Sequence, residues 1–319
     1  MIFRAVRELR EAGVLGMNGR NAGFILASNA RSRYPSADDK VMTKRLALEH
    51  QIPTPPLYHV VENHGDIAGF EERLQGHSEF VLKPARGSRG NGIVLIKDHT
   101  PAGFVKQSGE VISSGEFGYH ISGILSGIYS LGGQEDKAIF EALIHPDPVF
   151  AAVTHVGVPD VRIIVYRGVP VMGMVRLPTK DSDGKANLHQ GAIGAGIEIE
   201  SGATLTAVHR SRVITHHPDT GNPVSGIQVP HWGKMLLMAA RAFDMTGLGY
   251  LGIDMIIDKD RGPLLLELNA RPGLAIQLAN RAGLRQRLER VEKAPPELLD
   301  KPESRVSWAL ETFRIKEAW

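Results

Sequence analysis

Acidic and amide side chains lie at strand spacing in two short apolar runs near the carboxyl end of the chain. Asp254 falls within residues 250–257, and Glu267 and Asn269 fall near the end of residues 263–269. Residues two apart on a strand point to the same face, so Glu267 and Asn269 share a face. Pairing of the two runs as a hairpin could bring Asp254 beside them. Two carboxylates and an amide oxygen form a hard oxygen site that suits Mg2+ held jointly by protein and phosphate.

The alternative is that these acids simply face solvent on an antiparallel sheet. Against it, Glu267 follows the apolar residues 263–266 and precedes Leu268. An acid embedded among apolar neighbours usually has a partner or a chemical task, because burying an unpaired charge is costly. The pattern therefore favours a metal site over a solvated sheet face.

A glycine-rich stretch, Lys83-Pro-Ala-Arg-Gly-Ser-Arg-Gly-Asn-Gly92, separates two strand-like runs at 79–83 and 92–97. Its glycines let backbone N–H groups approach an anion without obstruction by a Cβ atom. No Gly-Lys-Ser/Thr closes the loop and no helix follows it, so it is neither a Walker loop nor a dinucleotide fingerprint. Such a loop can act as a flap over a triphosphate, with Lys83 as a point charge. A flexible hairpin with a surface lysine is the alternative.

The elements that must position these residues follow from periodicity. Ser36 and Asp39 have capping-box spacing, which predicts a helix from about 37 to 50 that the prolines of QIPTPP end. Strands and helices mix without regular βαβ alternation, so the predicted fold class is α+β rather than a doubly wound sheet. Further strands are expected at 138–144, 160–167 and 170–177, and further helices at 118–129, 230–245 and around 306–313.

Composition excludes several classes of protein. The chain has 319 residues, with 37 Lys and Arg against 35 Asp and Glu, and no cysteine. The near-balanced charge and the lack of a dense basic stretch argue against nucleic-acid binding, and the lack of cysteine excludes disulfides and thiolate sites. No apolar run approaches the roughly 20 residues of a membrane span, and charges interrupt the first residues as no signal peptide would allow. We expect a cytoplasmic protein; homo-oligomerisation is left open.

Three histidines lie in loop-like sequence. His216 and His217 have no third ligand nearby in a turn-rich stretch, so we expect surface residues rather than a zinc site. His189 has two interpretations, because it could line a substrate pocket or could be a loop histidine bonded to the backbone. Neither interpretation of His189 is favoured by the sequence.

Taken together, several segments resemble a known family. In order they are DDKVMTKRLALEHQIPTPP, FVLKPARGSRGNGI, IFEALI, PDVRIIVYRG, KANLHQGAIG, LGIDMII and LLLELNARPGL. Their types and order are similar to the ATP-grasp superfamily and, within it, to the RimK-type alpha-L-glutamate ligases. The similarity extends over about residues 38–275, and NLHQGAIG is particularly similar to RimK-type sequence.

The resemblance implies a role for individual residues. ATP and its phosphates would be contacted by Lys40, Lys83 and the flap residues Gly87, Ser88, Gly90, Asn91 and Gly92. The adenine hinge and the ribose would be contacted by Glu141, Leu143, Ile144 and Asp147. The ligands of two Mg2+ ions, which Mn2+ could replace, would be Asp254, Glu267 and Asn269. The groups beside the reacting phosphate, acyl group and substrates would be Arg162, Arg176, Asn187 and Arg271.

The resemblance also implies an ATP-grasp fold, in which two α+β subdomains clasp ATP. We expect a first subdomain at 40–142 that carries the flap and a second at 143–295 that carries the magnesium site. A short N-terminal segment at 1–39 and a C-terminal helix at 296–319 flank them. Such ligases normally carry a full α/β domain before the lysine of the DDK motif, and that domain often helps to hold the acceptor. Because only about 39 residues precede Lys40, we expect a reduced N-terminal region here.

The activity that the resemblance implies is ATP-dependent amide-bond formation. A carboxylate attacks the γ-phosphate of ATP to give an acylphosphate and ADP, and an amine then displaces phosphate. Such phosphoryl transfer needs positioning and charge neutralisation more than a protein nucleophile. The expected substrate is glutamate, joined in alpha linkage to a glutamate, peptide or protein acceptor. Two alternatives stay open: a non-catalytic ATP-binding regulatory protein, and a ligase for a cell-wall or sugar-linked acceptor.

Overall fold

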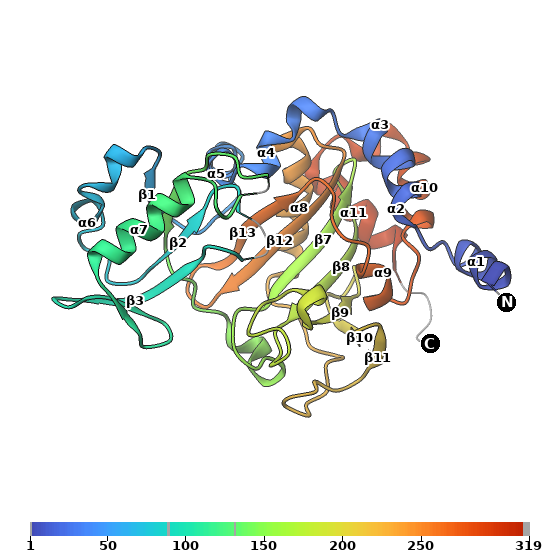
Figure 1. Cartoon of the computed structure of the whole chain (residues 1–319). Helices are drawn as coiled ribbons and strands as arrows, with labels where there is room; N and C mark the ends of the chain where they lie inside the picture. Colours follow the sequence, from blue (N-terminus) through green and yellow to red (C-terminus); the bar gives the residue numbers. More distant parts are fainter. Residues whose placement is uncertain (1, 88–89, 131, 315–319) are drawn as a thin grey trace. The chain divides into compact units, whose positions relative to one another are not determined.

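The computed structural model describes residues 2–87, 90–130 and 132–314, and Figure 1 shows the course of the chain. The chain divides into two compact units. The small unit comprises Asp39–Lys44 and Thr54–His145, and the large unit comprises the rest of the described chain. Both units combine helices with antiparallel sheets, so the predicted α+β class is confirmed. Within the described ranges, no helix is both long enough and apolar enough to cross a membrane.

The small unit is built on a six-stranded sheet in the order β1-β6-β2-β3-β4-β5. Five phenylalanines at its centre stack and cross one another: Phe70, Phe80, Phe104, Phe117 and Phe140. The strands are β1 (Leu57–Val61), β2 (Phe80–Pro84), β3 (Val94–Thr100), β4 (Gly103–Lys106), β5 (Val111–Ile112) and β6 (Ala138–Glu141). The helical segments are η3 (His64–Ile67), α6 (Phe70–Arg73) and α7 (Ser114–Leu125).

Two helix boundaries, one in the small unit and one where the chain first enters it, differ from the sequence prediction. The helix expected at 118–129 begins earlier, because Ser113 and Glu116 form a capping box at the start of α7. The helix expected at 37–50 is interrupted: α4 (Pro35–Asp38) ends before α5 (Lys40–Glu49) begins. Asp39 lies between them and accepts hydrogen bonds from the backbone N–H groups of Val41 and Met42, as an N-cap does.

The large unit is built on a seven-stranded sheet in the order β11-β10-β9-β8-β7-β12-β13, with every neighbouring pair antiparallel. The strands are β7 (Asp160–Tyr166), β8 (Val169–Leu177), β9 (Ile193–Ile197), β10 (Thr204–His209), β11 (Arg212–Ile214), β12 (Tyr250–Asp258) and β13 (Gly262–Asn269). The predicted strands at 160–167, 170–177, 250–257 and 263–269 are therefore present, within a residue or two of the expected bounds.

Helices lie against both faces of this sheet where glycines allow close approach. A Cβ atom on Gly173 of β8 would lie 2.9 Å from the ring of Trp232, which begins α8 (Trp232–Thr246). A Cβ atom on Gly196 of β9 would lie 2.6 Å from the backbone oxygen of Ala279, which ends α9 (Ile276–Ala279). Gly196 pairs with Met174, the neighbour of Gly173, so α8 and α9 cover opposite faces.

The remaining helical segments belong to the large unit or lead into it. In chain order they are α1 (Ile2–Glu11), α2 (Met17–Arg20), η1 (Asn21–Ile25), α3 (Leu26–Ser28), η2 (Arg31–Arg33), η4 (Pro148–Val153), η5 (Leu188–Gln190), α10 (Arg285–Glu292), η6 (Pro296–Leu299) and α11 (Pro302–Thr312). Buried Asn29 both donates to and accepts from the backbone of Tyr250, and so binds the N-terminal segment to the first residue of β12. At the other end of the described chain α11 packs on α8 and β8, and both terminal segments belong to the large unit.

Candidate functional site

The sheet register of the large unit places charged side chains in one row across four strands. Asp254 of β12 lies directly opposite Glu267 of β13 on one side and Arg162 of β7 on the other. On the next strand pair, Asp160 of β7 lies opposite Arg176 of β8. Directly opposed residues project from the same face of a sheet, so this charged row lies on one face. The hairpin predicted to bring Asp254 beside Glu267 is confirmed.

The members of the charged row are joined through Asp254, which is fully buried. Arg162 donates from Nε to Oδ1 at 2.6 Å and from Nη2 to Oδ2 at 2.5 Å. Arg176 donates to Oδ2 of Asp254 at 2.8 Å and to both carboxylate oxygens of Asp160. Asn269 also donates to Oδ2 of Asp254, at 3.2 Å. Five of the residues proposed from the sequence are thus gathered on this sheet: Arg162, Arg176, Asp254, Glu267 and Asn269.

Burial and charge act in opposition on these carboxyl groups. Burial alone would raise the pKa of Asp254, but the guanidinium groups of Arg162 and Arg176 hold that pKa well below its usual range. Burial raises the pKa of Asp160 to about 6, and the nearby charge of Asp254 adds to this effect while Arg176 opposes it. Asp254 therefore keeps its negative charge at neutral pH.

The donor set of the row fits a hard divalent cation. The carboxylates of Asp160, Asp254 and Glu267 face the guanidiniums of Arg162 and Arg176, so three negative charges meet two positive ones and one negative charge is in surplus. In the part of the chain that the structure describes, no three His, Cys, Asp or Glu side chains form a metal cluster. Here the third oxygen donor would be the amide of Asn269, which is the composition that Mg2+ accepts.

A second buried cluster, in the small unit, carries the opposite charge. Glu141, at the end of β6, has 2% of its surface exposed and forms ion pairs with two lysines. Lys83, at the end of β2, pairs with Oε1, and Lys44 of α5 pairs with Oε2 at 2.7 Å. Lys44 also donates to the backbone oxygen of Pro55 at 2.7 Å. We call Lys44, Lys83 and Glu141 the lysine cluster; two ammonium groups and one carboxylate leave it one positive charge in surplus.

Sequence reasoning missed Lys44, although one signal was present. Lys44 follows Lys40 by four residues, so the two lysines lie one helical turn apart on α5. The sequence assigned Glu141 to the adenine hinge with Leu143 and Ile144, and that backbone role stays a prediction. Its side chain, however, is committed to the two lysines.

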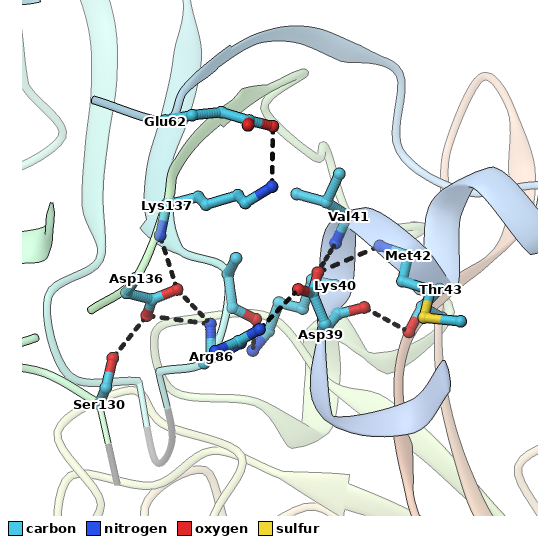
Figure 2. A network of polar contacts seen from close by, with 11 residues as sticks. Asp39, Lys40, Val41, Met42, Thr43, Glu62, Arg86, Ser130, Asp136 and Lys137 are labelled. Carbon is cyan, nitrogen blue, oxygen red and sulfur yellow. Dashed lines mark hydrogen bonds and ion pairs between the residues drawn. The ribbon is translucent and has the colours of Figure 1, made fainter. Parts of the chain in front are cut away.

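Hydrogen bonds hold the first part of the glycine loop in place, and Figure 2 shows those between Asp136 and Arg86. Lys40 donates from Nζ to the backbone oxygen of Gly87 at 2.9 Å. Both carboxylate oxygens of Asp136 lie 3.0 Å from the backbone nitrogen of Arg86, and Ser130 donates to Asp136 at 2.7 Å. The side chain of Lys40 thus binds the backbone of the loop. The contact of Lys40 with ATP that the sequence suggested stays a prediction.

The far end of the loop is also fixed. His120 of α7 is bonded to the backbone oxygen of Gly92 at 3.0 Å, and the hydroxyl of Tyr129 lies 3.3 Å from the other ring nitrogen of His120. Gly90 and Asn91 are exposed between these two anchors. Ser88, which the sequence assigned to phosphate binding, lies outside the described residues.

Other proposed site residues have local contacts that say nothing of a ligand. Asp147 accepts from the backbone of Val149 and so caps η4, and Asn187 accepts from the backbone of His189 and so caps η5. Arg271 is exposed, with its guanidinium 4.9 Å from the centre of the Tyr34 ring. His189 is exposed as well.

The expectation that both His216 and His217 are surface residues is half wrong. His216 is exposed, but His217 has 1% of its surface exposed. Its Nε2 lies 3.2 Å from the backbone oxygen of Pro178, and its Nδ1 accepts from the backbone nitrogens of Asp219 and Thr220. A turn-rich sequence does not reveal this burial, because the ring serves as a hydrogen-bonding centre for its own turn.

Comparisons with known proteins identify relatives of this fold. A family model described as sugar-transfer associated ATP-grasp matches residues 19–293. A comparison with curated proteins found no match. Among solved structures, ATP-grasp ligase PsnB with a minimal precursor is 12% identical, with a TM-score of 0.44, and the match covers 88% of this chain and 62% of that one.

Two further structures match over similar lengths. D-cycloserine synthetase DcsG is 14% identical, with a TM-score of 0.44, over 87% of this chain and 71% of that one. A RimK domain ATP-grasp protein from Sphaerobacter thermophilus is 12% identical, with a TM-score of 0.45, over 82% of this chain and 69% of that one. The family model spans most of the chain, including every residue of the charged row and of the lysine cluster. The predicted ATP-grasp relationship is thereby confirmed, and the chain belongs to the sugar-transfer associated ATP-grasp family.

Proposed function

We propose that this chain is an ATP-dependent carboxylate–amine ligase, which forms an amide bond through an acylphosphate and releases ADP and phosphate. The observation that carries this proposal is the opposite charge surplus of two clusters, the lysine cluster and the charged row. The lysine cluster has one surplus positive charge and suits a phosphate, whereas the charged row has one surplus negative charge and suits a divalent cation. MgATP contains both of the suited partners, a negatively charged triphosphate and a divalent cation.

The protein's own groups would bind and orient the reactants. Lys83 would donate from Nζ to a phosphate of ATP, and backbone N–H groups of the glycine loop would surround the phosphates. Asp254, Glu267 and Asn269 would hold Mg2+, and we infer two ions that Mn2+ can replace. When bound, Mg2+ neutralises the charge that develops on the transferred phosphoryl group.

The reaction itself needs no covalent bond to the protein. A substrate carboxylate oxygen bonds to the γ-phosphorus of ATP as the bond to ADP breaks. The amine then bonds to the acyl carbon and phosphate leaves, while the amine gives up a proton. Arg162 and Arg176 lie beside Asp254, with 11% and 12% of their side chains exposed, and would balance negative charge on the phosphoryl and acyl oxygens.

We further propose that the carboxylate substrate is glutamate, joined in alpha linkage to an amino acid, peptide or protein. A second candidate is a sugar-linked amine as acceptor, and the description of the matching family favours it. Both candidates use the same ATP chemistry, so they differ only in the substrate that completes the reaction.

The test is an ADP-release screen with ATP and Mg2+, using the twenty amino acids singly and in pairs and then amino-sugar acceptors. Mass spectrometry of the products would identify the amide bond. Glutamyl mass increments would support the glutamate proposal, and an increment on an amino sugar would support the second candidate. Nucleotide binding without turnover on any of these pairs, and on peptide and protein acceptors added to the same assay, would overturn the ligase proposal in favour of a non-catalytic nucleotide-binding protein.

A further inference from the structure

Lys44 is a buried lysine to which the proposed chemistry gives no task. The side chain of Lys44 is 8% exposed, and its ammonium group lies between Oε2 of Glu141 and the backbone oxygen of Pro55, at 2.7 Å from each. Lys83 occupies the other oxygen, Oε1, of the same carboxylate. Each lysine therefore binds its own oxygen, and the carboxylate is shared between them.

Sharing the carboxylate determines how tightly Glu141 holds Lys83. A buried carboxylate oxygen without a partner costs free energy, so Glu141 with Lys83 as its sole partner would draw both oxygens towards that ammonium group. The Lys83–Glu141 pair would then carry no net charge, and the ammonium group of Lys83 would be fully engaged by the carboxylate. With the ammonium group of Lys44 ion-paired to Oε2 at 2.7 Å, part of the carboxylate charge is already balanced there, and the cluster keeps a net positive charge.

We propose that Lys44 is a positioning residue for Lys83: by binding one oxygen of Glu141, it leaves an ammonium donor of Lys83 and one positive charge for an incoming nucleotide phosphate. The inference rests on the proposed nucleotide binding and deepens it. Lys44 contacts no phosphate in this scheme. Its effect passes through Glu141.

A positioning role of this kind has a pH signature. Burial lowers the pKa of Lys44 to about 8, with the positive charge of Lys83 adding to the effect and Glu141 opposing it. The charged groups that face Lys44 are Glu141 of β6 and Lys83 of β2. As pH rises through about 8, Lys44 loses its proton and the lysine cluster becomes a neutral Lys83–Glu141 pair. The surplus positive charge that attracts phosphate is then lost.

The experiment measures the Kd of ADP with Mg2+ by titration calorimetry at about pH 7 and about pH 9, on either side of the pKa of Lys44. For the unaltered chain we expect binding to weaken by roughly three- to tenfold at the higher pH, the effect of removing one nearby charge. Lys44→Met is expected to bind weakly at both pH values. Lys44→Arg keeps its charge at both pH values and is expected to lose the pH dependence while retaining binding.

Lys106→Met is the matched control. Lys106 forms an exposed ion pair with Glu110 in the same unit, so its loss removes a charge without touching the lysine cluster. We expect this variant to keep the pH dependence of the unaltered chain.

The outcomes separate the inference from the proposed function. Binding of ADP by the unaltered chain with the same Kd at both pH values would overturn the role of Lys44 alone. A Lys44→Met variant that keeps the normal pH dependence would overturn it too. If the unaltered chain binds no ADP at about pH 7 and none at about pH 9, both the inference and the proposed function are overturned. If Lys44→Met does not fold, the unaltered chain and Lys44→Arg still decide the matter.

Discussion

Arg162 and Asp254 face each other across strands β7 and β12 and are joined by both ends of the guanidinium group, at 2.6 Å and 2.5 Å. Arg176 adds a third hydrogen bond, at 2.8 Å, to the same carboxylate. Asp254 is therefore a fully buried charge with two cationic partners beside the proposed metal ligands Glu267 and Asn269. This arrangement keeps the carboxylate of Asp254 ionised.

Removal of Arg162 is expected to destabilise the fold. Arg162→Met leaves part of the Asp254 charge buried without its partner, and we expect a loss of about 3 kcal/mol in the free energy of unfolding. Urea denaturation measures this change in the free energy of unfolding. Arg210→Met is the control, because Arg210 pairs with Asp181 at an exposed position, and we expect a change of less than about 0.5 kcal/mol there. A similar small change for Arg162→Met would contradict the finding that this pair holds the buried charge.

Glu267→Ala is expected to abolish ligation and leave the fold intact. Glu267 is half-buried on β13, opposite Asp254, so the variant removes one proposed metal ligand without breaking the Arg162–Asp254 pair. We expect turnover to fall by about 100-fold or more, within the range seen when a group that stabilises the transition state is removed. ADP release and circular dichroism are measured together, with exposed Glu200→Ala as the control. Unchanged turnover in a folded Glu267→Ala protein would show that the metal site is wrongly assigned.

Two glycines of the flap provide a matched pair of variants. Gly90 and Gly92 have nearly the same left-handed backbone, with φ of +77° and +76°. A Cβ atom on Gly90 would meet nothing within 4 Å, whereas one on Gly92 would lie 2.6 Å from the Tyr129 ring. We expect Gly90→Ala to cost about 1 kcal/mol in unfolding free energy for its backbone strain. Gly92→Ala should cost at least about 1 kcal/mol more, because Tyr129 must move. Equal losses in urea denaturation would show that Tyr129 does not fix the loop.

His217 is expected to make folding stability sensitive to acid. Burial holds the pKa of His217 below its usual value, and its Nδ1 must stay unprotonated to accept from Asp219 and Thr220. The unfolded chain takes up the proton more readily, so stability is present above the unfolded pKa of about 6.5 and falls as pH drops below it.

His217→Asn tests this directly, because an asparagine oxygen can accept the same backbone bonds without titrating. We expect the urea midpoint of the unaltered chain to fall more between about pH 7.5 and about pH 5 than that of the variant. His216→Asn, at an exposed position, should behave as the unaltered chain does. Identical pH dependence in the unaltered chain and His217→Asn would refute this prediction.

The strand-borne part of the candidate site could be predicted from the sequence. Alternation along β13 places Glu267 and Asn269 on one face, and the short turn between β12 and β13 brings Asp254 opposite Glu267. The pairing of Arg162 with Asp254 depends instead on the position of β7 beside β12, strands about 90 residues apart in the chain. No local sequence pattern shows that β7 and β12 are neighbouring strands, because their pairing is long-range.

The helix-borne and loop-borne parts were harder to predict. Helical spacing does not say which of the two lysines on α5 is buried, so Lys44 was missed. The break at Asp39 depends on one side chain capping the next helix, which outweighs the continuous periodicity on either side. His217 is buried by its own turn, and its neighbours in the sequence are polar.

The central claim is that the charged row and the lysine cluster serve acceptor-dependent amide-bond formation. The most direct measurement compares ADP release by the unaltered chain with ATP, Mg2+ and paired carboxylate and amine substrates against the same reaction without the amine. The ligase proposal predicts ADP release that requires both substrates, one amide bond for each ADP, and loss of both in Glu267→Ala. Release of ADP that is unaffected by any amine, with no amide product, would contradict it.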